Sequence, residues 1–197
     1  MVKKILVISP HPDDGELWAG ASMARWAAAG AEIDHVCLSA LGDDERLAEF
    51  YAACKALDVS PLPNSFPDMG FQDHRRLIYD KLLQCEENIR PDLVIIPPTG
   101  DRHQDHAVVH EEAKRVFRFC SLLGFDIPYN EPTNRPTWYQ EMTEAELMTK
   151  MEAVNCYKSQ KYHQYTGVSA IRGLALVRGC EIRQEYAEAF EVIRWLN

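Results

Sequence analysis

The sequence has few basic residues and no long apolar segment. Lysine and arginine number 21 against 30 aspartates and glutamates, so the 197-residue chain carries a formal net charge of −9. This deficit argues against binding along a nucleic-acid backbone, which needs a basic face, and against an electrostatic membrane anchor. No stretch approaches the roughly 20 apolar residues that span a bilayer. The first apolar run is also too short for a signal peptide, because it ends at Pro10 and His11.

Cysteines are present but sparse. The six cysteines contain no Cys-x-x-C pair and are scattered from Cys37 to Cys180. Without a secretory signal, an even number of cysteines is weak evidence for disulfides. We therefore expect reduced, mostly buried thiols and a cytoplasmic location.

Apolar runs and helical periodicities alternate through the first 120 residues. Strands are predicted at 3–9, 32–39 and 92–97, and helices at 16–30, 44–57, 73–89 and 105–119. This alternation predicts an α/β fold with a Rossmann-like, open, mostly parallel sheet and helices on both faces. Residues 61–70 are predicted to be turns. The less regular last third predicts strands at 121–129, 136–142 and 189–195, and a capped helix at 143–157. The length suits one domain spanning residues 1–197.

Two predicted strands are followed by loops rich in histidine and carboxylate groups. His11-Pro12-Asp13-Asp14-Gly15-Glu16 follows the first strand, and Asp101-Arg102-His103-Gln104-Asp105-His106 follows the strand at 92–97. Sites in open α/β sheets form beyond the carboxyl ends of the strands. Neither loop contains the glycine fingerprint of a dinucleotide site or a P-loop. Their side chains are instead typical ligands of a divalent metal.

Spacing within the loops allows a mononuclear site. His11 and Asp14 are three residues apart, as are His103 and His106, so each pair can face one direction. One arrangement gives two histidines and one aspartate to the metal and leaves one of each for proton transfer, which is the pattern of catalytic zinc. In another, His106 and His110 chelate from one helix face. The simplest alternative is that these residues are solvated loop groups and helix N-caps.

The paired motifs carry a family resemblance. H-P-D-D-x-E after the first strand and D-x-H-x-D-H after a later one resemble the PIG-L/LmbE family of zinc-dependent N-acetylglucosaminyl deacetylases. Tyr157-Lys158-Ser159-Gln160 and residues 186–195 are similar to short bacterial members. Pro10 and Gln104 depart from the usual pattern without changing a ligand. The resemblance implies an LmbE-like fold over most of the chain.

By this resemblance, His11, Asp14 and His106 bind one Zn²⁺ per subunit, and other divalent metals are compatible with the same ligands. Asp13 matches the general base that deprotonates the attacking water. His103 matches the residue that stabilises the tetrahedral oxyanion or protonates the leaving amine.

Three acidic residues are expected to support the site. The resemblance implies that Asp105 contacts a ligand histidine rather than the metal and orients its ring, as carboxylates commonly do at metal centres. Glu16 and Asp101 are expected to support the two loops.

Three further residues are candidates for substrate contact. Arg46 matches the family's R-x-x-E segment and can hold a sugar hydroxyl or phosphate, although an ion pair with Glu49 explains it equally simply. Asp68 resembles a family aspartate that accepts hydrogen bonds from sugar hydroxyls, although a turn residue is the plain alternative. Arg172 is a candidate contact from late in the chain.

The resulting hypothesis is a zinc hydrolase that removes the N-acetyl group of an N-acetylglucosamine-containing small molecule or glycoconjugate and releases acetate. The resemblance is to amide hydrolysis and not to one particular acyl group. Two alternatives use the same residues: a non-haem Fe(II) enzyme with the same two-histidine, one-carboxylate set, and a non-catalytic sugar-binding module. A homo-oligomer is compatible with the resemblance.

Overall fold

The computed structural model describes residues 2–130, 136–160 and 163–196. Within these ranges one seven-stranded sheet has the order β3-β2-β1-β4-β5-β7-β6. The first five strands pair in parallel, whereas β7 is antiparallel to both β5 and β6. The strands are β1 (Lys4–Ser9), β2 (Glu32–Cys37), β3 (Ser60–Pro63), β4 (Leu93–Ile96), β5 (Ser121–Phe125), β6 (Trp138–Met142) and β7 (Tyr186–Arg194).

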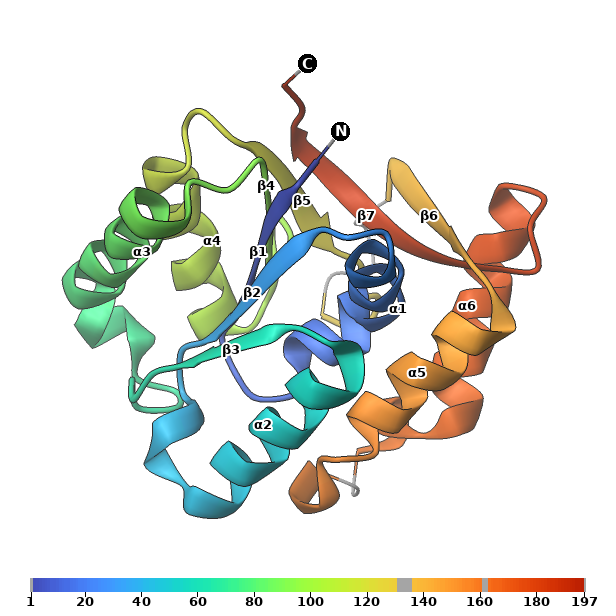
Figure 1. Ribbon diagram of the computed structural model, residues 1–197. Coiled ribbons are helices and arrows are strands. Elements are labelled where there is room, and N and C mark those ends of the chain that lie inside the picture. Colours follow the sequence, from blue (N-terminus) through green and yellow to red (C-terminus); the bar gives the residue numbers. More distant parts are fainter. Residues whose placement is uncertain (1, 131–135, 161–162, 197) are drawn as a thin grey trace.

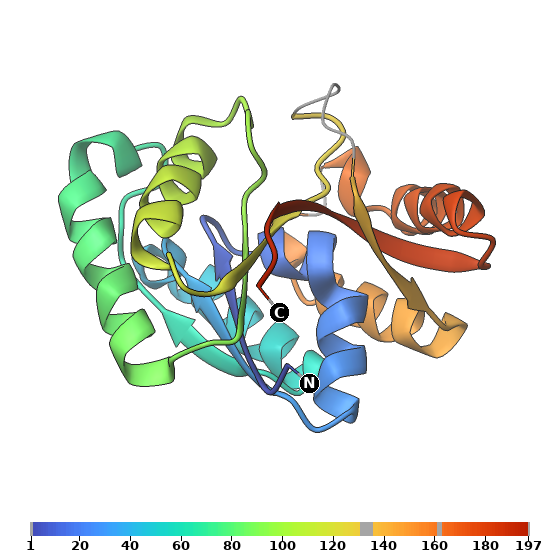
Figure 2. The same ribbon diagram turned by 90° about the horizontal axis from the view of Figure 1, so that it is seen from above.

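Helices cover both faces of this sheet (Figures 1 and 2). Helices α3 and α4 pack on one face, α1, α2 and α5 pack on the other, and α6 lies against β7. The helices are α1 (Asp14–Ala28), α2 (Asp44–Leu57), α3 (Arg75–Ile89), α4 (Gln104–Val116), α5 (Glu144–Val154) and α6 (Val168–Glu181). The predicted α/β class, with a mostly parallel sheet and helices on both faces, is therefore confirmed.

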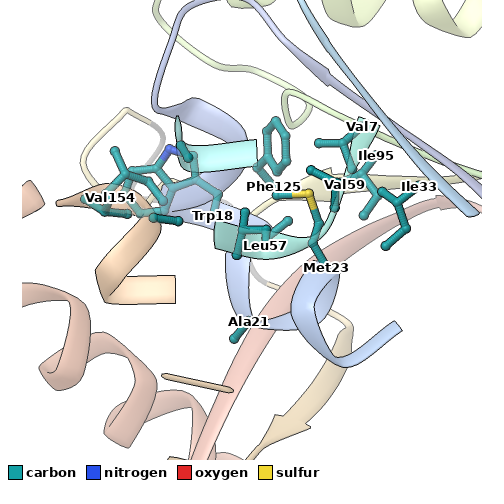
Figure 3. Packing of buried hydrophobic residues seen from close by; sticks show 14 of the residues in the cluster. Val7, Trp18, Ala21, Met23, Ile33, Leu57, Val59, Ile95, Phe125 and Val154 are labelled. Carbon is teal, nitrogen blue, oxygen red and sulfur yellow. The ribbon is translucent and has the colours of Figure 1, made fainter. Parts of the chain in front are cut away.

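Strand β1 lies between β2 and β4 and supplies side chains to both hydrophobic cores. Ile5 and Val7 pack on the α1 side, whereas Leu6 and Ile8 pack on the α3–α4 side, and each is at most 1% exposed. Successive side chains of a strand point to opposite faces, so a strand buried on both faces must be apolar throughout. Figure 3 shows the core on the α1 side, with Val7 and Phe125 near side chains from α1 and α2.

The last third departs most from the predicted elements. The predicted capped helix is α5, and its capping box between Thr143 and Glu146 is present. Strand β3 lies within the segment predicted as turns, and α6 was not predicted. The thiols are free, and four of them are buried, whereas Cys156 is half-buried and Cys180 is exposed. No helix in the described parts of the chain is long and apolar enough to cross a membrane.

Candidate active site

The two polar loops meet at the carboxyl ends of neighbouring strands. Strand β1 pairs with β2 on one side and with β4 on the other, so the chain changes direction across the sheet between β1 and β4. In open α/β sheets, ligands bind at this topological switch point. His11 to Asp14 follow β1, and Asp101 to His106 follow β4, which brings the two motifs together around one cavity of about 360 Å³.

Asp14 lies between two imidazole rings. Its Oδ2 atom is 3.4 Å from Nδ1 of His11 and 3.3 Å from Nε2 of His106, and it also accepts the backbone N–H of His11 at 3.0 Å. His103, the N-cap residue of α4, joins the group, since one ring nitrogen from each of the three histidines lies within 4.8 Å of the others. Two imidazoles and one carboxylate thus converge on one point.

The remaining nitrogen of each of these two imidazoles is held by a second carboxylate. His106 Nδ1 donates to Asp101 at 2.7 Å, and His11 Nε2 donates to Asp105 at 3.1 Å. An ionised carboxylate only accepts, so the proton of each neutral ring belongs on that nitrogen. When each ring gives up its second proton, the nitrogen that faces Asp14 has the free lone pair that metal ligation requires. This N, N, O donor set fits a divalent metal such as zinc.

The supporting carboxylates are themselves fixed by backbone groups. Asp105 is fully buried and accepts the N–H groups of Met69 at 2.7 Å and Phe71 at 3.1 Å. Asp101 accepts the N–H of His103 at 2.8 Å and the side-chain amide of Asn130 at 2.8 Å. Each acidic residue thus joins an imidazole to a loop, which restricts how far the donor set can shift.

The electrostatics of the cluster favour a cation. Burial lowers the pKa of His11, but hydrogen bonds to Asp105, Asp14 and Asp68 outweigh it and raise the pKa to about 11. Burial is likewise outweighed at His106, where Asp14 and Asp101 raise the pKa to about 9. Burial would raise the pKa of Asp14, but the two histidines lower it below its usual range. The carboxylates therefore create a negative potential at the point where the donor atoms converge.

Asp13 and His103 flank this point in different electrostatic environments. Burial, with Asp14 and Glu16 nearby, raises the pKa of Asp13 well above its usual range, so this carboxyl binds a proton more strongly than an exposed aspartate does. His103 Nδ1 accepts the N–H of Asp105 at 3.3 Å, so the neutral ring carries its proton on Nε2. Burial and the neighbouring histidines also lower the pKa of His103, which keeps this donor neutral.

The backbone of Asp13 is strained. Its φ angle of 91° lies in the left-handed region, which residues other than glycine adopt at a cost of about 1–3 kcal/mol. No side chain fits at Gly15, two residues later, because a Cβ atom there would lie 2.4 Å from Nε2 of His35. The first turn of α1 therefore packs directly against β2, and this contact fixes the direction in which Asp13 and Asp14 leave the strand.

Glu16 is buried behind the loop and joins it to the chain after α5. Its Oε1 atom accepts the hydroxyl of Tyr157 at 2.7 Å and lies 3.6 Å from Nδ1 of His35, and burial raises the pKa of Glu16 to about 7. Glu16, His35 and Cys54 form a second compact group, which is wholly buried.

Arg46 and Asp68 lie at one side of the cavity. Nη1 of Arg46 donates to Asp68 at 3.3 Å, and Oδ1 of Asp68 is 3.1 Å from Nε2 of His11. With its amide oxygen turned toward Arg46, Gln160 accepts from Nη2 at 3.0 Å and from Nε at 3.2 Å. The alternative partner of Arg46, Glu49, instead accepts two hydrogen bonds from Ser159 at 2.9 and 2.6 Å.

The structure places Arg172 elsewhere. Its guanidinium donates hydrogen bonds to Glu144 at 2.5 and 2.7 Å and to the hydroxyl of Tyr186 at 2.8 Å. Arg172 therefore does not line the cavity. His110 is also outside the cluster, because its Nδ1 donates to the carbonyl of Pro97 at 2.9 Å. Several residues of the cavity wall, from beyond the second motif and from the loop before α3, were not predicted from the sequence: Met69, Tyr129, Asn130, His163 and Tyr165.

Fold and site together define an α/β protein with a candidate metal centre at its topological switch point. The PIG-L family, described as GlcNAc-PI de-N-acetylase, matches residues 6–117. The match covers more than half of the chain, which therefore belongs to this family. All four residues of the central cluster, His11, Asp14, His103 and His106, lie within the matched segment.

Relatives with curated descriptions support this assignment. YaiS of Escherichia coli K12, described as an uncharacterized deacetylase, is 28% identical over 170 residues, which cover 80% of this chain and 91% of YaiS. A 1D-myo-inositol 2-acetamido-2-deoxy-alpha-D-glucopyranoside deacetylase of Salinispora arenicola is 24% identical over 62% of this chain. The chain spans 53% of that relative, about half of its length.

Solved structures share the whole fold. The conserved protein TT1542 from Thermus thermophilus aligns with a TM-score of 0.83 and 28% identity, over 100% of this chain and 97% of that one. GalB, the 4-carboxy-2-hydroxymuconate hydratase of Pseudomonas putida KT2440, aligns with a TM-score of 0.85 over 99% of this chain and 98% of its own. At 19% identity the likeness to GalB shows the fold alone, which does not determine the reaction.

Proposed function

We propose that residues 1–197 form one catalytic domain, a zinc-dependent N-deacetylase that hydrolyses the acetamide of an N-acetylglucosamine-containing substrate. The observation that carries this proposal is the position of Asp14 Oδ2 between His11 Nδ1 and His106 Nε2. The deacetylase relatives and the PIG-L match support the reaction class.

His11, Asp14 and His106 would hold the metal. When bound, the metal supplies Lewis acidity, which polarises the amide carbonyl and makes a water molecule in the site easier to deprotonate. Asp13 accepts the proton of the attacking water. His103 donates from Nε2 to the carbonyl oxygen as negative charge develops there. The nitrogen takes up a proton as the C–N bond breaks, and the products are the free amine and acetate.

The sugar is held by polar groups at the rim. Asp68 accepts hydrogen bonds from hydroxyl groups, and Arg46 donates from a planar fork whose direction Gln160 fixes. These contacts place the acetamide between Asp13 and His103 without taking part in bond cleavage.

Acetate release from a panel of N-acetylglucosamine conjugates tests the proposal. The protein is loaded with zinc and compared with Asp13→Ala and with Asp44→Asn, which changes an exposed acid at the start of α2. We expect release by the wild type and Asp44→Asn, and a loss of roughly 10³-fold or more in Asp13→Ala with little loss of bound metal. Oxygen-dependent turnover with stoichiometric iron would favour the Fe(II) alternative. Tight sugar binding without acetate release would favour the binding module.

A further inference from the structure

A second cavity lies directly beside the candidate active site. It measures about 190 Å³ and is enclosed by α1, α6, β7 and the segment after β5. Its walls are mostly apolar and include Leu17, Trp18, Ile171, Leu174, Ala175 and Ala189. The proposed acetate chemistry makes no use of this space.

The charged groups of this cavity neutralise one another. Lys150 Nζ donates to Glu188 at 2.7 Å, and both side chains are buried. Arg178 donates to Asp126 through two nitrogens at 2.7 and 3.1 Å. Each cation thus has a carboxylate partner within the wall. An uncharged, apolar occupant suits such a lining better than an ion does.

The cavity adjoins the active-site pocket and shares two wall residues with it. Tyr129 and Tyr165 line both spaces, and their rings stack with centroids 4.8 Å apart. Trp18 lies one helical turn after Asp14 in α1, and its ring centroid is 5.6 Å from that of Tyr129. Figure 3 shows Trp18 between Val154 and Leu57 in the hydrophobic core. The apolar space therefore begins where the wall of the metal-binding cluster ends.

The two sides of the cluster differ in polarity. The ligand residues follow β1 and β4, near the centre of the sheet. Arg46 lies in α2, which contacts β3 at one edge of the sheet. The apolar cavity lies toward the other edge, where β7 and α6 bound it. A secondary amide carries one substituent on its nitrogen and one on its carbonyl carbon. With the sugar on the Arg46 side, the acyl group is directed toward the apolar cavity.

We propose that this chain hydrolyses N-acylated amino sugars whose acyl group is longer than acetyl and occupies the cavity as an unbranched chain. The inference rests on the proposed function and specifies its substrate class. At about 30 Å³ per water-sized group, the cavity holds about six carbon-sized groups. Water adds to the carbonyl carbon and the C–N bond breaks, so the free amine and a carboxylate of unchanged chain length are released.

A series of N-acylglucosamines tests the acyl assignment, with the free amine as the product measured. Acetyl, butanoyl, hexanoyl, octanoyl and dodecanoyl substrates are compared at equal metal loading. We expect kcat/KM to rise by about threefold to fourfold per methylene group as far as hexanoyl or octanoyl, since burial of each methylene is worth about that factor. It then falls with dodecanoyl, which exceeds the cavity.

Substitutions in α6 distinguish the effect of filling the cavity from a general loss of activity caused by an added side chain. Ala175→Leu fills the cavity from its wall, and Ala170→Leu fills it from an exposed position at its edge. Both are expected to lower the hexanoyl-to-acetyl ratio of kcat/KM at least tenfold. Ser169→Leu adds the same side chain at the next exposed position, which does not line the cavity, and should keep the wild-type ratio.

A binding measurement gives a readout that is independent of turnover. Calorimetry on the metal-free protein should show octanoate binding at least tenfold more tightly than butanoate, and Ala170→Leu should remove the difference. Release of the free amine at a rate that does not depend on acyl chain length would overturn the acyl assignment and leave the proposed function standing. A rate that instead rises with the alkyl chain of an N-acetylglucosaminide would assign the cavity to the aglycone and overturn it as well. Absence of all amide hydrolysis would overturn the proposed function and, with it, the acyl assignment that rests on it, even if preferential octanoate binding were retained.

Discussion

Oδ2 of Asp105 lies 3.1 Å from Nε2 of His11, although 94 positions separate the two residues in the chain. The same carboxylate accepts the backbone N–H groups of Met69 and Phe71. It therefore orients the imidazole that follows β1 and fixes the loop that carries Asp68. One buried acid thus couples the geometry of the donor set to the polar side of the pocket.

Replacing Asp105 with Asn should weaken metal binding by about 10–100-fold, because the imidazole of His11 loses the ionised acceptor that fixes its tautomer. Competition against a chromogenic chelator measures the affinity. Glu111→Gln, a change at a half-exposed acid of the same helix, is the matched control and should retain wild-type affinity. Equal affinities of Asp105→Asn and the wild type would exclude this role of Asp105.

Gly15→Ala should destabilise the fold by about 1–3 kcal/mol, the usual range for overpacking a core. The new Cβ would lie 2.4 Å from Nε2 and 2.7 Å from Cε1 of His35. Urea denaturation gives the free energy of unfolding. Gly42→Ala serves as the control because no atom lies within 4 Å of its added Cβ. An unchanged midpoint in Gly15→Ala would show that α1 can move away from β2 at no cost.

Asp13→Gly should retain or increase stability, by up to about 1 kcal/mol, while abolishing turnover. Glycine adopts the positive φ of 91° without strain, and the substitution also removes the buried carboxylate. Asp58 also has a positive φ, of 58°, but it ends α2 away from the site. Asp58→Gly should therefore match the gain in stability and keep full activity. Thermal unfolding and acetate release measure the two effects, and a marked loss of stability in Asp13→Gly would contradict the interpretation of strain.

His35 should contribute to acid instability. Burial lowers the pKa of His35 to about 3, whereas the unfolded chain takes up the proton near the usual value of 6.5. Its contribution to stability is therefore fully present above about pH 6.5 and is lost as the pH falls toward 3, at about 1 kcal/mol per pH unit.

The comparison with His35→Gln isolates this contribution. Unfolding free energies are measured for both proteins at about pH 7.5 and about pH 5 in the presence of a chelator. The wild type should lose about 1–2 kcal/mol more than the variant between the two pH values. Parallel losses would show that His35 is protonated in the folded state.

Much of the fold followed from periodicity, because the strands buried on both faces are continuous apolar runs and most helices have one apolar face. Strand β3 was missed because Pro61 and Pro63 argue against a strand. They are tolerated here because β3 is an edge strand. Helix α6 was missed because Gly173 and Gly179 interrupt it and apolar residues such as Val177 are exposed, which obscures its periodicity.

The candidate site, like the fold, was predictable only in part. The residues of the two motifs were predictable, since each follows a parallel strand and such strand ends share one edge of the sheet. The position of Arg172 was not predictable, because residue spacing does not tell which side chains will lie beside a helix that comes late in the chain. Tyr129 and His163 come from irregular segments, whose approach to the pocket depends on tertiary packing and leaves no local pattern.

The division of the pocket between two stretches of chain has a consequence for engineering. The metal-type donors lie within residues 6–117, whereas Tyr129, Gln160, His163 and Tyr165 come from beyond that segment. The candidate metal ligands thus lie in the first part of the chain, whereas part of the pocket wall comes from the last third. Grafting the latter portion of one relative onto the front portion of another should redirect which molecule is processed while retaining the bond that is cleaved.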